Sequence, residues 1–273
     1  MILSIITINR NNAEGLQKTM QSVVDQTFDQ FEYIVVDGAS TDTSVDIIRS
    51  FEKHRPIKWV SEPDNGIYNG MNKGIRMASG DYIMILNSGD YLAGPNVIEQ
   101  MCQAISEAHF PAIFYGNIIK IWPNGKTIVD HQIQGNITMY DFYSGTLNPD
   151  GTYIRRSLFD QYGFFDETMK ICSDWAWMLN SIALHGEKPV HTNVNSIYFD
   201  MTGVSESGSK SQKTILHERR QVLEATLMPS ILADYDRYGA DIRMMRRIHR
   251  HKWAYKIVHF IERILFKLEK KSK

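Results

Sequence analysis

The chain has 273 residues, of which 43% are hydrophobic and 22% are charged, and its formal net charge is −1. A chain of this length forms one large or two small domains. Its two cysteines exclude a disulfide framework, and no apolar run reaches the roughly 18–20 residues that a membrane-spanning helix needs. We find no secretory signal, so we expect a cytoplasmic protein.

The first 90 residues predict alternating strands and helices. Apolar runs typical of buried strands occupy residues 2–8, 31–36, 57–61 and 82–86. Segments with helical spacing of apolar residues separate these runs. The order β-α-β-α-β-α-β predicts parallel strands with right-handed crossovers. We therefore expect an α/β protein with a Rossmann-like, mostly parallel central sheet flanked by helices.

Local signals suggest where two of these helices begin and end. Ser40 or Thr41 is expected to cap the second helix, because short hydroxyl side chains accept from free N–H groups at a helix start. The third helix is expected to end at residues 78–80, where Gly80 can take a left-handed conformation.

The alternation breaks down after residue 116. A helix from Pro95 to about residue 108, with Val97, Ile98, Met101 and Ile105 inward, still fits it. We then predict a strand at 111–115, a hairpin at 118–129 and a strand at 152–156. A loop or short helix at 160–165 and an aromatic-rich helix at 174–184 should follow. The predicted elements after these are two short strands within 189–199, a mobile loop at 202–210 and a long helix at 211–227.

Several familiar nucleotide-binding motifs are missing. No Gly-x-Gly-x-x-Gly follows the first strand, which argues against a dinucleotide dehydrogenase. A nucleotidyltransferase would need a Gly-rich phosphate loop there, and residues 9–12 do not form one. No set of Cys and His residues has zinc spacing.

Acidic residues follow two of the predicted strands. Asp37 comes after the second strand and Asp90 after the fourth, and parallel strands bring their carboxyl ends to one edge of the sheet. Asp174 lies later in the chain. Each aspartate alone can be read as a helix cap or turn former, whereas the three together suggest a site.

Four segments carry a resemblance to a known family. They are residues 4–7 (SIIT), 36–42 (VDGASTD), 62–74 (EPDNGIYNGMNKG) with its continuation to Asp90, and 170–175 (KICSDW). With these segments the sequence resembles the family-2 glycosyltransferases of the GT-A fold over about residues 1–230. The resemblance implies an α/β GT-A domain, with a nucleotide-sugar half at 1–116 and an acceptor half at 117–230.

The resemblance also implies roles for individual residues. Thr7 and Asp37 would contact the nucleotide base, usually uracil. Asp64, Asn72 and Lys73 would shape the donor pocket. Four further residues would also bind the donor, namely Asn9, Gly66, Asn87 and Ser88. Asp90 matches the last acid of the family's Asp-x-Asp motif, which holds Mg²⁺ or Mn²⁺ on the diphosphate, and Asp174 matches the catalytic base.

The chain departs from the family pattern at three places. Asn87 and Gly89 stand where many members carry Asp, which leaves Asp90 as the one carboxylate for the metal. Asn69 replaces a common Asp. Residues 148–152 stand where relatives often have His-Gln before the pair Arg155 and Arg156.

These residue types suit glycosyl transfer. A hard divalent ion with few protein carboxylates can take its other ligands from phosphate and water. An acceptor hydroxyl attacks well only when a base such as Asp174 removes its proton. We therefore expect an inverting transferase that moves a sugar from a nucleotide-diphospho donor to a glycan or lipid-linked acceptor of a surface polysaccharide. The alternative is a non-catalytic nucleotide-sugar-binding protein.

Two aromatic and two basic side chains allow two interpretations each. Trp175 and Trp177 either form a wall for a sugar ring or pack in the core. Arg155 and Arg156 either meet an acceptor phosphate or form surface salt bridges.

The C-terminal segment forms a separate element, for which we set the bounds 231–273. Residues 241–273 contain 11 Lys and Arg against 3 Asp and Glu. One helical face collects Trp253, Ile257, Phe260, Ile261, Ile264 and Leu268. Such a basic amphipathic helix fits an anionic membrane surface, and docking on the protein or in a homodimer is the alternative. Nucleic acid is not expected as a partner, because no recognition motif accompanies the charge.

Overall fold

The computed structural model describes residues 2–145, 147–203 and 208–271. The chain separates into two compact units, Met1–Val222 and Leu223–Lys273. The first unit contains the sheet and the candidate site, and each unit is described by itself below.

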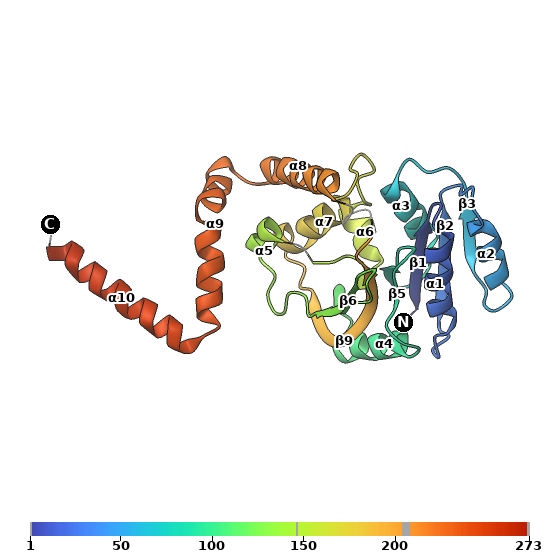
Figure 1. The fold of residues 1–273 in the computed structure, drawn as a ribbon, viewed down its shortest axis with the longest axis horizontal. Coiled ribbons are helices and arrows are strands. Elements are labelled where there is room, and N and C mark those ends of the chain that lie inside the picture. Colours follow the sequence, from blue (N-terminus) through green and yellow to red (C-terminus); the bar gives the residue numbers. More distant parts are fainter. Residues whose placement is uncertain (1, 146, 204–207, 272–273) are drawn as a thin grey trace. The chain divides into compact units, whose positions relative to one another are not determined.

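The first half of the larger unit has the predicted order. Strands β1 (Leu3–Asn9), β2 (Phe31–Asp37), β3 (Lys58–Ser61) and β4 (Tyr82–Ile85) are parallel neighbours in the order β3-β2-β1-β4. Helices α1 (Ala13–Val24), α2 (Ser44–Phe51) and α3 (Ile67–Met77) connect them, as Figure 1 shows. The predicted Rossmann-like arrangement is therefore confirmed.

Alternating residues of β1 face opposite layers of helices. Leu3 and Ile5 belong to the core cluster that also contains Leu16 and Met20 of α1. Successive side chains of a strand point to opposite faces of the sheet, and Ile6 faces α3 instead. A Cβ on Gly74 of α3 would lie 2.4 Å from Cγ2 of Ile6. A glycine therefore lets α3 pack directly on the sheet.

The second half continues the same sheet with mixed strand directions. Beyond β4 the order is β8 (Thr152–Arg155), β6 (Ile113–Ile121), β9 (Val190–Asp200) and β5 (Tyr91–Leu92). β8 is antiparallel to β4 and β6, whereas β9 is parallel to β6. Helix α4 (Val97–Glu107) buries its four predicted core residues. The sheet thus extends past its parallel half.

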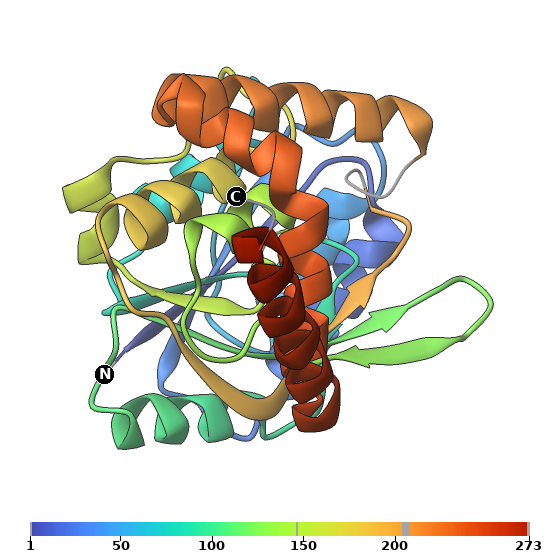
Figure 2. The same ribbon diagram turned by 90° about the vertical axis from the view of Figure 1, so that its left-hand side faces the viewer.

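Two strand predictions were wrong in their bounds. The strand at 111–115 and the first arm of the hairpin form one strand, β6, and residues 189–199 form one strand, β9, instead of two. The pairing of β6 with β9 shifts register around Gly116, where a Cβ would lie 2.4 Å from the carbonyl oxygen of Val194. The hairpin of β6 with β7 (Thr127–Asp130) is present and extends from the body of the unit in Figure 2.

The predicted cap of α2 was also wrong, whereas α3 ends within the predicted residues 78–80, although without a left-handed Gly80. Thr43 is the N-cap of α2, and the carboxylate of Asp42 accepts from the N–H of Ser44, while Ser40 bonds to Asp37. Helix α3 ends at Ala78 in an extended conformation, and the φ angle of Gly80 is not positive. Tertiary contacts thus decided which residue caps α2 and which conformation Gly80 adopts.

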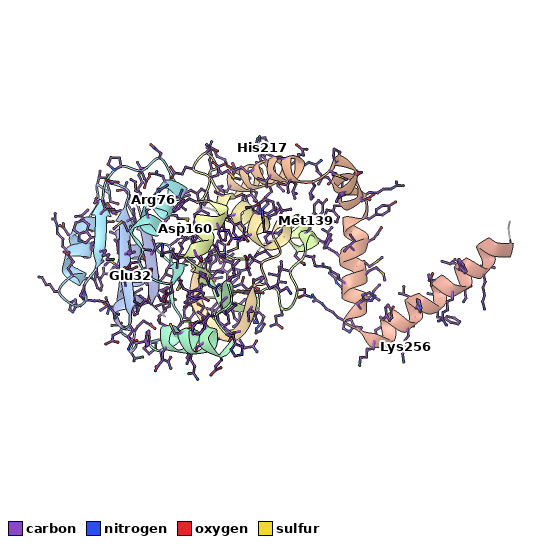
Figure 3. All side chains as sticks on the ribbon, turned by 180° about the vertical axis from the view of Figure 1, so that it is seen from behind. Glu32, Arg76, Met139, Asp160, His217 and Lys256 are labelled. Carbon is purple, nitrogen blue, oxygen red and sulfur yellow. The ribbon has the colours of Figure 1, made fainter. Side chains whose placement is uncertain are left out.

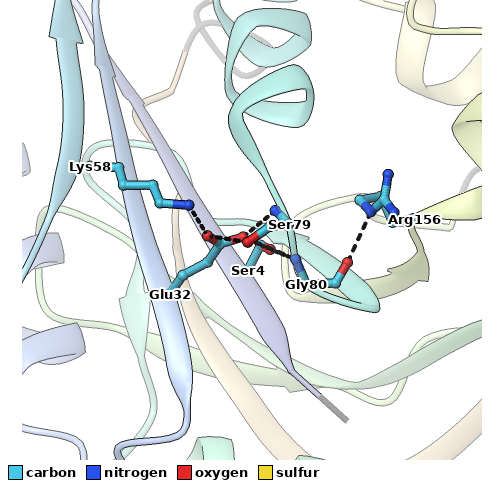
Figure 4. A network of polar contacts seen from close by, with 6 residues as sticks. All are labelled: Ser4, Glu32, Lys58, Ser79, Gly80 and Arg156. Atoms are coloured by element: carbon cyan, nitrogen blue, oxygen red, sulfur yellow. Dashed lines mark hydrogen bonds and ion pairs between the residues drawn. The ribbon is translucent and has the colours of Figure 1, made fainter.

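A half-buried carboxylate organises the turn around Gly80. Glu32 of β2 accepts from the hydroxyl of Ser4 and from the N–H groups of Ser79 and Gly80 (Figure 4). The ammonium group of Lys58 lies 2.6 Å from the same carboxylate. These bonds tie β1, β2 and β3 to the segment that leads into β4.

The other helices of this unit lie around the second half of the sheet. They are α5 (Met139–Ser144), α6 (Ser157–Tyr162), α7 (Ser173–Met178) with a π-helical continuation at Leu179–Leu184, and α8 (Ser209–Thr226). Trp175 and Trp177 are buried, so the core-packing interpretation of these residues is the one observed. Of the predicted loop at 202–210, residues 204–207 lie outside the described residues, and α8 already includes 209 and 210.

The smaller unit is helical. It contains the end of α8, then α9 (Pro229–His249) and α10 (Lys252–Lys271). Figure 3 labels Lys256 on α10. Among the helices that the structure describes, none is both long enough and apolar enough to cross a bilayer.

Candidate active site

A cavity of about 560 Å³ opens at the carboxyl ends of the parallel strands. Its wall combines the loop after β1, the start of α3, the turn after β4, the segment before α7 and the end of β9. The polar side chains that line it are Asn9, Arg10, Asn12, Asp64, Tyr68, Asn87, Ser88, Asp90, Asp150, Lys170, Asp174, Asp200 and Thr202. Gly66 lines the cavity as well. Seven residues of the predicted site therefore line one cavity, namely Asn9, Asp64, Gly66, Asn87, Ser88, Asp90 and Asp174.

The turn after β4 places Asp90 in the wall. Gly89 has a φ of +114°, which favours glycine. Thr19 of α1 accepts from the N–H of Gly89 at 3.0 Å and donates to the carbonyl oxygen of Asp90 at 2.6 Å. Asp90 is only 5% exposed, and its carboxylate accepts from the N–H of Asp200 at 2.7 Å.

Burial gives the carboxylate of Asp90 a higher proton affinity than an exposed aspartate has. Burial raises the pKa of Asp90, and the nearby charge of Asp200 adds to the rise, giving a value of about 7. The carboxylate of Asp200 accepts from the N–H and the hydroxyl of Thr202. Two neighbouring carboxylates thus face the cavity, one from the turn after β4 and one from the end of β9.

Asp174 lies in the first turn of α7. Its carboxylate accepts from the hydroxyl of Tyr68 at 3.1 Å and from the N–H of Trp175 at 2.6 Å. Surrounding protein raises the pKa of Asp174 to about 6, although these hydrogen bonds and the charge of Arg219 lower it. Its side chain still reaches the cavity, so it can act as a base near neutral pH.

Asp150 is a further acid between these two positions. Asn87 donates to its carboxylate at 2.6 Å, and burial raises the pKa of Asp150, followed by the charges of Asp90 and Asp174. The side-chain oxygen of Asn87 is buried and has no hydrogen-bond partner among the described residues. The three acids therefore interact electrostatically within one cavity.

Asp37 lies behind the wall near Asn9. Burial raises the pKa of Asp37, but hydrogen bonds from Ser40, Ser61 and Asn9 outweigh it and hold the pKa below its usual value. Asn9 donates to Asp37 at 2.9 Å and itself lines the cavity. Asp37 thus stays ionised and fixes the side chain of Asn9.

Asp64 approaches this region from the turn before α3. Its carboxylate lies 3.5 Å from the guanidinium of Arg10. A Cβ on Gly38 would lie 2.2 Å from its Oδ2 atom, so a side chain at position 38 would displace the carboxylate of Asp64.

Besides Asp37, three predicted site residues do not line the cavity. Thr7 is buried with its hydroxyl 3.0 Å from that of Tyr33. Asn72 bonds to the backbone of Phe165 and to Glu167, while Lys73 bonds to the carbonyl oxygen of Pro63. These residues support the wall, and their roles toward a ligand stay predictions.

The arginine pair lies elsewhere. Arg155 and Arg156 line a separate hollow of about 390 Å³ with Tyr82 and Phe110. Arg155 donates to the carbonyl oxygen of Phe110, and Arg156 donates to that of Gly80 at 3.1 Å. Their side chains are therefore engaged at the opposite ends of the strands from the cavity.

The sequence did not identify four residues of the site. Asp200 follows a predicted strand, so the strand-end rule that found Asp37 and Asp90 applied to it as well. Tyr68 and Arg10 had no such signal, and Asp150 appeared only as a departure from a family motif. Their places depend on how distant segments meet.

The described residues contain no group of three or more Asp, Glu, His or Cys side chains that could hold a metal ion together.

Comparison with solved structures identifies the fold as that of GT-A glycosyltransferases. TarS of S. aureus, in a structure with UDP-GlcNAc, has a TM-score of 0.66 and 19% identity, over 84% of this chain and 69% of that one. A mannosyltransferase of Pyrobaculum calidifontis, in complex with GDP-Man and Mn²⁺, has a TM-score of 0.54 and 16% identity, over 71% of this chain and 55% of that one.

Sequence comparison identifies the family. The model of glycosyl transferase family 2 matches residues 4–181. An uncharacterized glycosyltransferase of Mycobacterium tuberculosis is 32% identical over 74% of this chain and 76% of its own length. A PGL/p-HBAD biosynthesis glycosyltransferase of Mycobacterium bovis is 26% identical over 64% of this chain and 67% of its own. The chain belongs to glycosyl transferase family 2 and is a nucleotide-sugar-dependent glycosyltransferase.

Proposed function

We propose that this protein is an inverting, metal-dependent transferase that moves a sugar from a uridine-diphospho donor to a hydroxyl group of a glycan or lipid-linked acceptor. The observation that carries the proposal is that Asp90 and Asp174, from elements 84 residues apart in the chain, line one cavity. Inversion requires the leaving group and the base to act on opposite sides of the anomeric carbon, and two separate acids in one cavity can serve these sides.

The residues near Asp90 fit Mg²⁺ or Mn²⁺. The carboxylates of Asp90 and Asp200 and the unpartnered oxygen of Asn87 are hard oxygen donors, which these ions prefer. The donor diphosphate and water would complete the shell. When bound, such an ion stabilises the negative charge that develops on the leaving diphosphate.

Asp174 is the proposed base. Its pKa of about 6 keeps it mostly ionised at neutral pH while leaving it basic enough to take a proton from an attacking hydroxyl. The hydroxyl group of Tyr68 orients the carboxylate by donating to its Oδ1 atom. The second oxygen is then the one we assign to the acceptor.

The loop after β1 and the start of α3 form the proposed donor side. Asn9 lines the cavity and is fixed by Asp37, so we propose that Asp37 helps to recognise the nucleotide base of the donor through Asn9. Asp64, Gly66 and Ser88 line the same region. Thr7, Asn72 and Lys73 are proposed to shape it from behind the wall.

The acceptor proposal rests on the smaller unit. The apolar residues of α10 are exposed, among them Trp253 at 68% and Phe260 at 64%, and basic residues accompany them. A helix of this kind lies in the interface of an anionic membrane. We therefore propose that the enzyme works at the inner face of the plasma membrane on a lipid-linked acceptor of surface polysaccharide synthesis.

A donor screen tests this function. Purified enzyme is incubated with a panel of nucleotide sugars and Mn²⁺ or Mg²⁺, and free nucleotide is measured with and without an acceptor lipid extract. We expect release from a uridine-diphospho sugar that stops when the metal is chelated. If a donor binds in calorimetry but is never turned over with any acceptor extract, the non-catalytic binding protein replaces the enzyme.

A further inference from the structure

Helix α8 carries a buried acid that holds the segment in front of α7. Glu218 is 8% exposed, and its carboxylate accepts from three consecutive backbone N–H groups. These belong to Lys170 at 2.7 Å, Ile171 at 3.0 Å and Cys172 at 3.0 Å. The thiol of Cys172 is also 3.8 Å from a carbonyl oxygen of α8.

This segment leads directly to Asp174. Only Ser173 separates the last of the three N–H groups from the proposed base. An ionised carboxylate that accepts several N–H groups makes strong hydrogen bonds and fixes the backbone that donates them. Glu218 therefore fixes the backbone that leads into Asp174.

The next residue of α8 reaches the other side of the same helix start. The guanidinium of Arg219 lies 5.1 Å from the ring centre of Trp175, the residue after Asp174. Arg219 and the indole N–H of Trp175 both donate to the carbonyl oxygen of Gly145, at 3.3 Å and 3.2 Å. The Nε atom of Arg219 is buried without a partner among the described residues.

Several other groups face the Asp174 carboxyl. Tyr68 of α3 donates to it, and Asp150 before β8 and Cys172 before α7 interact with it electrostatically. Surrounding protein raises the pKa of Asp174, and Arg219 is the positive group that lowers it again. Lys170 lines the same cavity.

We propose that Glu218 and Arg219 are positioning residues of the transfer reaction. Glu218 holds the backbone that delivers Asp174 to the acceptor side of the cavity, and Arg219 places a positive charge beside it. This inference rests on the proposed role of Asp174 as the base. The bonds of Glu218 and the contact of Arg219 with Trp175 place the pair on the side of α8 turned toward α7, whereas the neighbouring His217, labelled in Figure 3, is exposed.

Arg219→Gln tests the electrostatic part. Glutamine keeps a donor for Gly145 but removes the charge, so the pKa of Asp174 should rise. We expect the acid limb of the kcat profile to move up by about half a pH unit, which is roughly a threefold loss of kcat well below that pKa, with recovery above pH 8. Arg219→Lys should restore the wild-type limb.

Lys213→Gln is the matched control, because it removes a positive charge from an exposed position of the same helix. Its profile should superimpose on that of the wild type. If Arg219→Gln lowers kcat by one factor at every pH, or leaves it unchanged, the electrostatic role of Arg219 is refuted. Should this variant not fold, the Asp174 resonance followed by ¹³C NMR in Arg219→Lys must still titrate near its wild-type pKa.

Glu218→Gln tests the mechanical part. The amide keeps the length but has only one acceptor oxygen for three N–H groups. We expect kcat to fall about tenfold while the KM of the donor stays unchanged, because the donor side of the cavity is not involved. An unchanged kcat in a folded variant would overturn the role of Glu218.

A different result would refute the proposed role of Asp174 as the base. If Asp174→Asn retains turnover, Asp174 is not the base, whatever the α8 variants do. If Asp174→Asn is inactive and the α8 variants behave like the wild type, only the positioning roles are refuted.

Discussion

At the scale of single residues, the aspartates near the cavity differ in proton affinity because their surroundings differ. Asp37 accepts hydrogen bonds that favour its charged form, so its pKa lies below the usual value. For Asp90 and Asp174 burial outweighs the hydrogen bonds, so the pKa of each lies above it. Only the second kind of environment makes a carboxylate that takes up a proton near neutral pH.

The first prediction concerns Asp174. Asp174→Asn should lower kcat by about 10²–10⁴-fold, because an amide cannot accept the acceptor's proton, and it should leave the Kd of the donor within about twofold. Single-turnover kinetics and calorimetry measure the two effects. The wild-type kcat should fall as the pH drops through about 6, where Asp174 becomes protonated. Turnover that survives in Asp174→Asn would contradict the assignment.

A second prediction at this scale concerns stability and Glu32. Burial raises the pKa of Glu32, but bonds from Lys58, Ser4 and Ser79 outweigh it and lower the pKa from 4.5 to about 2. A lowered pKa stabilises the fold above pH 4.5, and this contribution is lost as the pH falls toward 2. Glu32→Gln should therefore reduce the free energy of unfolding at pH 7 by roughly 2–3 kcal/mol.

Urea unfolding at several pH values checks this. The difference between the wild type and Glu32→Gln should shrink steadily below pH 4.5. A difference that stays constant down to pH 3 would show that the lost packing, and not the charge of Glu32, is responsible.

At the scale of elements, close approach decides how α3 and β4 join. A Cβ on Gly80 would lie 2.6 Å from the Oγ atom of Ser4 and 2.8 Å from the carbonyl oxygen of Ile2. Backbone atoms of β1 cannot move away cheaply, because β1 is the central strand of the parallel half. The turn between α3 and β4 therefore depends on the small size of glycine more than on its freedom of φ.

This gives the third prediction. Gly80→Ala should lower the free energy of unfolding by about 1–3 kcal/mol, because β1 or the turn must shift. Gly94→Ala is the matched control, since its nearest neighbours would lie 3.9 Å from the new Cβ. Thermal or chemical unfolding compares the two variants. Equal stabilities would show that the turn adapts without cost.

At the scale of the whole molecule, charge separates the two ends of the sequence. Residues 1–240 contain 19 basic and 28 acidic residues, whereas residues 241–273 contain 11 and 3. An acidic catalytic part has no electrostatic attraction to an anionic membrane, so any such attraction must come from the C-terminal segment.

The fourth prediction follows. Deleting residues 241–273 should abolish cosedimentation with vesicles that contain anionic lipid and should leave donor binding unchanged. In the full chain, Trp253→Ser with Phe260→Ser should weaken vesicle binding, whereas Met244→Ser, an exposed apolar residue of α9, should not. Binding that persists after the deletion would favour docking of the segment on a protein, which size-exclusion chromatography would detect as a dimer.

The sequence by itself determined the α/β order, the parallel half of the sheet and the inward residues of α4, because periodicity and strand ends are local features. It also located Asp90 and Asp174. Only the tertiary structure decided that Asp150 and Asp200 join them, that β9 is one strand and that Gly80 serves close packing. The physical reason is distance along the chain: the bond from Asp200 to Asp90 joins residues 110 positions apart, and no local pattern encodes such a contact.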